Sequence, residues 1–390
     1  MTMKWILLFS LISSVCLGQK VPTCIKHSSK AKFEIDLYPA FQRSDTYPLS
    51  MVAESLEYIP LELTENNLLG EYLKTIYITS DGIFVFDYAH GVYRFTREGK
   101  YLNKIGRVGR GPGECVKPIG MVLDSINKSV IFLDHDRLVK YDYEGNFLKN
   151  HKLNFNANEI LITKDGDLLL NDMYYPSQKP DARFSLQFFS ETSDKLVSKV
   201  SCEVKDQIPF GISNPSMYNY NGQTFIKDYW SDTIYQVIDP FNLKTYAIIN
   251  TGRLKHRYSD DKSMIKGGKN LNDSWVIDIT YISETDRFIF LTSNKGLFIY
   301  DKVSNDTFCC NYEKENNQYS LFRNDLTPGP NIKTFLYNYP ISNNIQISYN
   351  TALSFFDKSS KKLLTGLDSS LRNLDPNNNQ VLVIIKFKKE

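Results

Sequence analysis

The 390-residue sequence has only five histidines and six cysteines, and neither type is grouped as a metal or redox centre requires. The histidines, at positions His27, His90, His135, His151 and His256, are scattered, and no Cys-x-x-Cys pair is present. Zinc centres draw on closely spaced Cys and His ligands, and dithiol centres use Cys-x-x-Cys. The sequence therefore gives no sign of either centre.

Nucleotide-binding and serine-hydrolase motifs are also missing. The glycine-rich stretch Ile105–Glu114 is not followed by Gly-Lys-Ser/Thr, and a strand rather than a helix is expected after it. It is therefore neither a phosphate-binding loop nor a dinucleotide fingerprint. No Gly-x-Ser-x-Gly nucleophile elbow occurs anywhere in the chain.

A strong net charge of either sign is absent as well. The 46 basic and 44 acidic residues give a formal charge of +2, which falls to +1 when a leader carrying Lys4 is removed. This balance gives no support for nucleic acid as a partner. Aromatic content is high, with 25 Tyr and 24 Phe, which suits β-sheets and is not typical of a disordered chain.

The longest hydrophobic run is confined to the first eighteen residues. Lys4, the apolar core Trp5–Ile12 and a small-residue cleavage site follow the pattern of an export signal, so we predict a signal peptide at 1–18. The run is shorter than the roughly twenty residues that span a bilayer, and we expect no transmembrane segment in the mature chain. Val15 is bulky directly before Cys16, so we do not expect lipid anchoring there.

Five cysteines remain after removal of the leader, and an odd number cannot pair completely. Cys309 and Cys310 are adjacent in a strand-like run, so their side chains are expected on opposite faces of a sheet. We predict buried, unreactive thiols rather than a disulfide framework.

Along the remaining chain, an apolar strand, an acidic or polar corner, a second apolar strand and a polar turn recur six times. Each copy is preceded and followed by a further apolar run, so each repeat has four strands. The paired runs are Ile83–Asp87 with Val92–Phe95, Val130–Asp134 with Leu138–Asp142, Leu168–Asp172 with Phe184–Phe189, Thr224–Asp228 with Thr233–Val237, Phe288–Leu291 with Gly296–Tyr300, and Ile345–Ser348 with Ala352–Phe356. The pattern predicts an all-β protein, a six-bladed β-propeller of four-stranded antiparallel blades, whereas a β-sandwich would not repeat this period six times.

Closure of such a ring needs strands from both ends of the chain in one blade. The candidates are Ser55–Leu63 and Val381–Phe387, which we expect to meet in the last blade. The predicted organisation is therefore a signal peptide at 1–18, a lead-in segment at 19–54 and the propeller at 55–390. Helical signals are scarce, and only Ser369–Leu374 and Asp260–Ile265 are expected to form short turns.

Three stretches resemble a known family: the Gly-Arg-x-Gly-Arg-Gly-Pro-Gly-Glu run Gly106–Glu114, the segment Asp232–Tyr235 and the closing run Asn379–Lys386. They are similar to exported six-bladed β-propellers of anaerobic bacteria, relatives of TolB-like and NHL-repeat propellers. The resemblance covers nearly the whole mature chain and implies the fold, but little about activity. This chain departs from the family pattern at Cys115, where an aromatic residue often stands, and at Asn378–Gln380.

The long irregular segments are expected on one end of the ring. In an antiparallel blade, the loop between strands two and three leaves by the same end as the connection to the next blade, while the turns at the other end are short here. The long segments are Met173–Arg183, Ser201–Ser216, Gly252–Asp273 and Asn311–Pro330, together with the loop Arg107–Glu114. Binding residues concentrate in such loops, so we predict the binding site at this end.

The candidate binding residues at this end combine charge with aromatic rings. They are Arg107, Arg110, Glu114, Asp134, His135, Asp136, Arg137, Tyr229, Trp230 and Asp232. Arginine forks bind carboxylates bidentately, and the two aromatic residues can stack on a sugar ring or a peptide side chain. The alternative is that the arginines pair with local acids to fix blade packing. The recurrent Asp87, Asp134, Asp172 and Asp228 are expected to cap turns rather than perform chemistry.

We therefore expect a non-catalytic binding propeller at the bacterial cell envelope, periplasmic or on the cell surface. Its expected partner is an envelope protein, a peptide or a glycan. The alternative is a metal-dependent lyase or hydrolase with its metal at the channel mouth, held by Asp134, His135 and Asp136. No cofactor is predicted, although aspartates and backbone carbonyls are able to hold a Ca²⁺ ion in the central channel.

Overall fold

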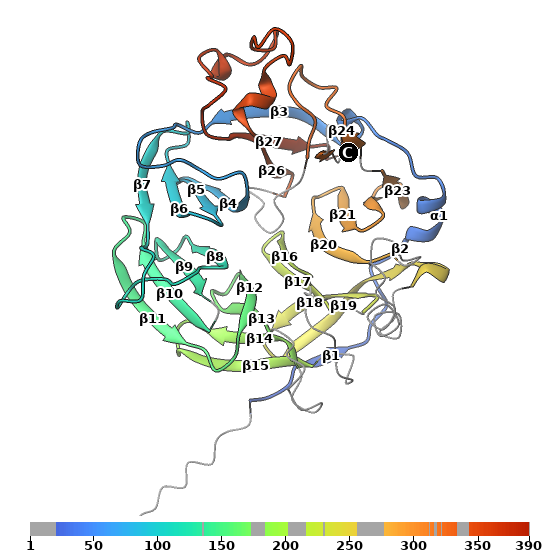
Figure 1. The fold of residues 1–390 in the computed structure, drawn as a ribbon. Coiled ribbons are helices and arrows are strands. Elements are labelled where there is room, and N and C mark those ends of the chain that lie inside the picture. The colour runs from blue at the N-terminus through green and yellow to red at the C-terminus, as the bar shows by residue number, and fades with distance from the viewer. Residues whose placement is uncertain are drawn as a thin grey trace, which may run out of the picture.

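The computed structural model describes residues 21–134, 136–172, 184–201, 216–228, 231–255, 277–311, 313–315, 318–320, 322–333 and 343–389. Six small antiparallel sheets stand around a common axis as the blades of a ring (Figure 1). The predicted all-β, six-bladed propeller is confirmed.

Blades 1 to 5 follow one another along the chain, and the first strand of each lies nearest the axis (Figure 1). Blade 1 contains β4 (Leu73–Thr79), β5 (Gly82–Asp87), β6 (Gly91–Phe95) and β7 (Tyr101–Ile105); blade 2 contains β8 (Gly120–Asp124), β9 (Ser129–Asp134), β10 (Arg137–Asp142) and β11 (Phe147–Lys152). Blade 3 contains β12 (Ala157–Ile162), β13 (Leu168–Asp172), β14 (Phe184–Ser190) and β15 (Lys195–Ser201); blade 4 contains β16 (Ser216–Tyr220), β17 (Gln223–Lys227), β18 (Thr233–Asp239) and β19 (Asn242–Asn250). Blade 5 contains β20 (Ile279–Glu284), β21 (Phe288–Ser293), β22 (Gly296–Asp301) and β23 (Asp306–Cys310).

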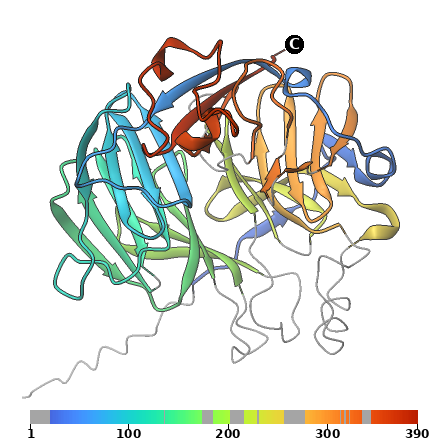
Figure 2. The same ribbon diagram turned by 45° about the horizontal axis from the view of Figure 1, so that its top comes forward.

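Blade 6 closes the ring with strands from both ends of the chain. Among the described residues its order is β26 (Ile345–Asn350), β27 (Val381–Phe387) and β3 (Ala53–Pro60). Strand β27 pairs antiparallel with β3 from Val381 opposite Pro60 to Phe387 opposite Ala53. Figure 2 shows the red C-terminal strand beside the blue β3. The predicted meeting of the two terminal segments is confirmed.

The second run expected in the sixth repeat, Ala352–Phe356, is not a strand. Residues Ala352–Phe355 form the 3₁₀ helix η5, and β27 takes the place beside β26. Ala352 and Phe355 are buried in the core between blades 5 and 6, whereas Leu353 is 56 % exposed. Burial at positions three apart fits a helical turn and not a strand, so this prediction was wrong because the apolar spacing was misread.

The core consists of apolar layers between neighbouring blades, and this explains the continuous apolar runs. In β5, Ile83 and Val85 pack towards blade 6, while Phe84 and Phe86 pack towards blade 2. Each blade is therefore buried on both faces, and successive residues of a strand serve two different interfaces.

Residues 22–48, here called the N-terminal strap, run along the outer edges of blades 3 to 6 (Figure 1). Strands β1 (Ile25–His27) and β2 (Phe33–Asp36) pair parallel with β19 of blade 4. Before them, Thr23 bridges Lys199 of blade 3, and after them the helix α1 (Leu37–Gln42) packs beside β23. Two further bridges, from Asp45 to Cys310 of blade 5 and from Pro48 to Arg323 of the link after blade 5, carry the strap towards β3.

The remaining short elements lie outside the blades. They are η1 (Leu49–Met51), η3 (Gly252–Leu254), η6 (Ser369–Leu371) and the hairpin of β24 (Glu313–Glu315) and β25 (Gln318–Ser320). The turn expected at Ser369–Leu374 is confirmed by η6, and Asp260–Ile265 lies outside the described residues.

Four of the cysteines are buried and form no disulfide, as expected of buried thiols: Cys24, Cys115, Cys309 and Cys310. Cys309 packs between blades 4 and 5 and Cys310 between blades 5 and 6, so the adjacent thiols do lie on opposite faces. Burial raises the pKa of the Cys115 thiol to about 11 and that of Cys309 to about 12. Cys202 lies outside the described residues.

Candidate functional site

The two ends of the ring differ in the links they carry. We call the end with the links between second and third strands, and between successive blades, the loop face. Its described links include residues 88–90 of blade 1 and residues 106–119 between blades 1 and 2, whereas the turn between β4 and β5 at the other end has two residues. The expected segments Met173–Arg183 and nearly all of Ser201–Ser216 lie outside the described residues.

The glycine-rich link, residues 106–115, is folded back on itself on the loop face. The Gly109 amide donates to the Cys115 carbonyl at 2.9 Å, and the Cys115 amide donates to the Arg107 carbonyl at 2.8 Å. Two backbone hydrogen bonds thus tie the outgoing arm of the loop to the returning arm. We call these residues the arginine loop.

Blade 2 braces the arginine loop from below. The Tyr141 hydroxyl donates to the Gly113 carbonyl at 2.8 Å, and the Arg137 guanidinium donates to the Glu114 carbonyl at 3.3 Å. Gly113 has a φ of +73°, and a β-carbon there would lie 2.6 Å from the Phe147 ring. Only glycine fits this position without strain.

The Glu114 carboxylate points into the loop rather than outward. Its Oε2 accepts a hydrogen bond from the Gly111 amide at 2.8 Å. Glu114 is half-buried and acts as an internal brace, so its carboxylate is not displayed for a partner.

Arg107 and Arg110 are both exposed at the tip of this braced loop. Within the part of the chain that the structure describes, neither guanidinium group forms a hydrogen bond or an ion pair. These residues therefore do not support the alternative, in which the two arginines pair with local acids and fix blade packing. Two unpaired arginine forks stand on a rigid backbone.

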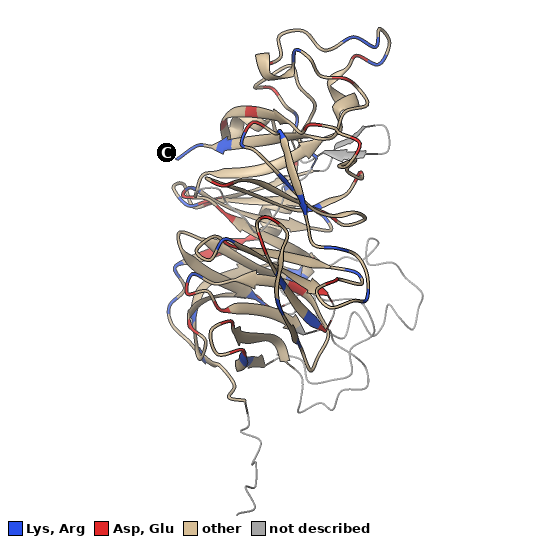
Figure 3. Ribbon diagram, turned by 90° about the vertical axis from the view of Figure 1, so that its left-hand side faces the viewer, with Lys and Arg blue, Asp and Glu red and all other residues tan. Residues whose placement is uncertain are grey.

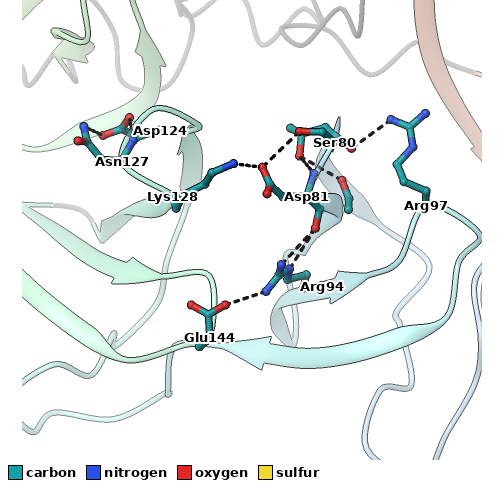
Figure 4. A network of polar contacts seen from close by, with 10 residues as sticks. Ser80, Asp81, Arg94, Arg97, Asp124, Asn127, Lys128 and Glu144 are labelled. Carbon is teal, nitrogen blue, oxygen red and sulfur yellow. Dashed lines mark hydrogen bonds and ion pairs between the residues drawn. The ribbon is translucent and has the colours of Figure 1, made fainter.

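Arg94, at the opposite end of the ring, shows what a packing arginine looks like in this fold (Figure 4). Its guanidinium lies 3.2 Å from the Glu144 carboxylate, donates to the Asp81 carbonyl at 3.2 Å and covers the Tyr143 ring at 5.4 Å. Lys128 pairs with the Asp81 carboxylate beside it. Lysines, arginines and acids are interspersed over the blades (Figure 3), so the unpaired state of Arg107 and Arg110 does not follow from a shortage of acids.

Asp87 and Asp134 end the second strands of blades 1 and 2, and their carboxylates accept backbone hydrogen bonds, as expected of turn caps. Asp87 accepts from the amides of Gly70 at 2.6 Å and Ala89 at 2.8 Å, and its Oδ2 lies 2.8 Å from His90 Nδ1. Each aspartate thereby fastens the incoming inter-blade link to its blade.

The Asp134 carboxylate is fully engaged. It accepts hydrogen bonds from the amides of Val116 and Lys117, both at 2.9 Å, and from the Arg137 guanidinium at 2.5 Å. Burial opposes ionisation of this group, but these donors outweigh it and lower the pKa of the carboxyl below its usual value.

The contacts of Asp134 count against the alternative metal centre at Asp134, His135 and Asp136. Both Asp134 oxygens already accept hydrogen bonds, and His135 lies outside the described residues. Asp136 is half-buried, and its carbonyl accepts from Leu153 at 2.6 Å. Among the described residues, no three His, Cys, Asp or Glu side chains are placed to hold a metal ion.

Seven of the ten predicted site residues are described, and six of these seven lie together. Arg107, Arg110, Glu114, Asp134, Asp136 and Arg137 gather at the junction of blades 1 and 2. Asp232 lies in blade 4, where its carboxylate pairs with Lys255. Tyr229 and Trp230 lie outside the described residues.

Sequence reasoning missed a cluster of aromatic and cationic groups beside the arginine loop. The Tyr88 ring, 39 % exposed, has the Lys117 ammonium 5.6 Å and the Lys74 ammonium 5.9 Å from its centre. Tyr72 meets the Tyr88 ring edge-on at 6.4 Å. The signal was available, because Tyr88 follows the Asp87 cap directly and Lys74 interrupts an apolar inner strand.

Lys74 is also attracted to the carboxylate of Glu159, on the inner strand of blade 3. Its ammonium donates to the Ile119 carbonyl, burial lowers its pKa, and attraction to Glu159 opposes that change. Burial raises the pKa of Glu159 to about 7, against the opposing effect of Lys74. The inner strand of blade 3 therefore carries a carboxyl group, Glu159, with a pKa near neutral pH.

The model of a family described as a domain of unknown function, DUF4934, matches residues 32–386. The chain belongs to this family. No curated protein matches the chain. The DUF4934 match covers the whole described ring and most of the strap, so the family shares the propeller. None of the described helices is long and apolar enough to cross a membrane.

Solved structures similar to this DUF4934 protein include a candidate exported protein of Bacteroides fragilis. That structure has a TM-score of 0.69 and 20 % identity, covering 94 % of this chain and 100 % of that chain. A DUF4221 family member of Bacteroides vulgatus has a TM-score of 0.49 and 12 % identity, covering 86 % of this chain and 97 % of that one. Virginiamycin B lyase of Staphylococcus aureus has a TM-score of 0.46 and 10 % identity, covering 85 % and 99 %. From the first we take the fold alone, and from the other two nothing further.

Proposed function

We propose that this DUF4934 protein is a non-catalytic binding propeller of the cell envelope, and that Arg107 and Arg110 hold an anionic group of its partner. The observation that carries the proposal is that both guanidinium groups are exposed and unpaired among the described residues, on a loop braced by blade 2. A braced loop loses little conformational entropy on binding, and an arginine fork binds a carboxylate with two parallel hydrogen bonds.

The neighbouring groups extend the same chemistry. Lys117 is exposed and lies over the Tyr88 ring, so a partner held by the arginines meets a second cation and an aromatic face. A carboxylate next to an apolar or ring-bearing group suits this surface, as in an acidic peptide or an acidic glycan.

The cellular setting of the proposal comes from the sequence. The leader pattern at 1–18 supports export to the periplasm or the cell surface, where the partner would be an envelope protein, peptide or glycan. We also propose that the protein is related to TolB-like and NHL-repeat propellers, and that it binds its partner without a cofactor.

Thermal unfolding of residues 19–390 with poly-L-glutamate or with polygalacturonate tests the proposal. A ligand at a hundred times its dissociation constant stabilises a protein by about 2.7 kcal/mol, which a melting curve resolves. We expect at least one of these probes to raise Tm, added salt to weaken the effect and a chelator to leave it unchanged.

The double variant Arg107→Ala with Arg110→Ala should abolish the shift. The matched control is Lys358→Ala with Lys362→Ala, which removes the same charge from two exposed lysines between β26 and β27. No shift with either probe, or the same shift in the arginine variant, would contradict the proposed function.

A further inference from the structure

The structure assigns a peptide-docking edge to blade 2: we infer that an extended acidic peptide segment of a partner protein adds as a strand to β11. The inference rests on the proposed function, because the arginine loop supplies the charge that selects the peptide. It goes further by naming the partner class and the way it binds.

The outer strands of the blades differ in whether the N-terminal strap pairs with them. The N-terminal strap bridges the outer strands of blades 3, 4 and 5, through Thr23 on Lys199, β1 and β2 on β19, and Asp45 on Cys310. Strand β11 is not reached by the strap, and within the described residues its backbone forms hydrogen bonds only with β10. An open edge strand is a template for another strand.

The direction of the β11 peptide groups follows from one hydrogen bond. The Leu153 amide, next after β11, donates to the Asp136 carbonyl at 2.6 Å and so points towards β10. The amide and carbonyl of one residue in a strand point to the same side, and those of the next residue point to the opposite side. The amides and carbonyls of Lys152 and Asn150 therefore point away from β10. These outward groups are the ones an added strand would use.

The surface beside this edge is apolar and basic. Phe147 is 43 % and Leu148 is 50 % exposed, at the start of β11. The arginine loop adjoins them, because a β-carbon on Gly113 would lie 2.6 Å from the Phe147 ring, and its Val108 is 66 % exposed. Apolar side chains next to Arg107 and Arg110 match a peptide in which acidic and apolar residues alternate.

The fold already binds extended chain in this way at another blade. In blade 4, Ile25, Lys26 and His27 pair parallel with Asn242, Leu243 and Lys244 of β19. An outer strand of this propeller therefore accepts an added strand. Strand β11 offers the same kind of edge to a chain from outside.

The experiment is a display library of random dodecapeptides, selected on residues 19–390 and counter-selected on the Arg107→Ala, Arg110→Ala variant. We expect enrichment of peptides with alternating acidic and apolar residues. Asn150→Pro removes an outward amide but no bond to β10, and it should weaken binding of an enriched peptide by at least about fivefold. The matched control Asn150→Ala keeps the amide and should bind like the wild type.

Hydrogen exchange gives a second readout that does not depend on how well the proline variant folds. The bound peptide should slow exchange of the Asn150 and Lys152 amides in the wild-type protein, while the Lys149 and His151 amides should change little. Equal binding by Asn150→Pro, unchanged exchange at the outward amides, or a failure to enrich peptides would overturn strand addition. If the arginine variant alone loses binding, the proposed function stands and the β11 edge does not; if neither variant matters, both fail.

Discussion

The carboxylate of Glu114 occupies the space that a side chain at position 109 would need. Its Oε2 lies 2.0 Å from where a β-carbon on Gly109 would stand, and the same oxygen accepts from the Gly111 amide at 2.8 Å. One acid thus fixes the turn between Arg107 and Arg110. The positions of the two arginines depend on an internal contact that involves neither of their side chains.

Two glycines of the arginine loop should respond differently to alanine. Gly113→Ala should lower the free energy of unfolding by about 1–3 kcal/mol, because φ is +73° and the obstacle is the Phe147 ring. Gly109→Ala should cost less than about 1 kcal/mol, because the Glu114 carboxylate ends a flexible side chain that is free to swing away. Urea unfolding measures both, and equal losses would count against this account of the loop.

Arginines at the two ends of the ring should separate into structural and functional groups. Arg94→Ala should destabilise the protein by about 1–2 kcal/mol, since it loses the Glu144 ion pair, two bonds to the Asp81 carbonyl and contact with two rings. Arg107→Ala and Arg110→Ala should each stay within about 0.5 kcal/mol of the wild type. Chemical denaturation of the three variants measures these differences. A large loss of unfolding free energy in Arg107→Ala would mean that Arg107 has a packing role.

Glu159 should make stability depend on pH near neutrality. Its folded pKa of about 7 lies above the usual value of 4.5, so the folded state binds the proton more tightly. Its contribution is complete below pH 4.5 and is lost as the pH rises through 7, a fall of about 1–3 kcal/mol in the free energy of unfolding. Glu159→Gln, which cannot titrate, should flatten this part of the pH profile measured by denaturant unfolding. A profile identical to that of the wild type would show that Glu159 titrates normally.

Removal of the closing strand should unfold the whole ring. Deletion of residues 381–390 takes away β27, which pairs with β26 on one side and β3 on the other. We expect loss of the cooperative thermal transition, whereas deletion of Lys389 and Glu390 alone should leave Tm nearly unchanged. An unaltered Tm in the longer deletion would mean that closure contributes little to stability.

The buried thiols should not react with a thiol reagent in the native state. With the leader removed and Cys202 replaced by serine, Cys24, Cys115, Cys309 and Cys310 remain, all of them buried. Burial raises the pKa of Cys115 to about 11, so little thiolate exists at mildly alkaline pH. A thiol reagent should label none of the four until denaturant is added. Rapid native labelling of even one would reveal an opening between blades.

The repeat of apolar runs predicted the blades because every blade is buried on both faces. Runs such as Ile83–Asp87 carry no polar interruption, and each became a strand, β5 in this case. Ala352–Phe356 failed because five apolar and polar residues fit a strand or a 3₁₀ turn equally well, and only the arrival of β27 excludes the strand. The strap could not be foreseen, since β1 and β2 are only three and four residues long and pair with β19 outside the four-strand repeat.

The site was predictable in part. The glycine pattern located the arginine loop, and the corner positions of Asp87 and Asp134 indicated their capping role. The ion pair of Asp232 was not predictable, because its partner Lys255 comes from the link that follows blade 4. The Tyr88 cluster was missed because one of its lysines, Lys74, lies on the inner strand of blade 1 and the other, Lys117, on the link to blade 2.

The route of the strap has a consequence in time. A chain is made from its N-terminus, so residues 22–48 emerge long before the outer strands of blades 3, 4 and 5 that they join. The partner of strand β3 is synthesised later still, because β27 lies near the last residue. Such distant pairings slow folding, because the entropy of closing a long loop is lost before the contacts form. The first part of the chain to be synthesised is therefore among the last to find its place, and it needs protection from wrong partners until synthesis ends.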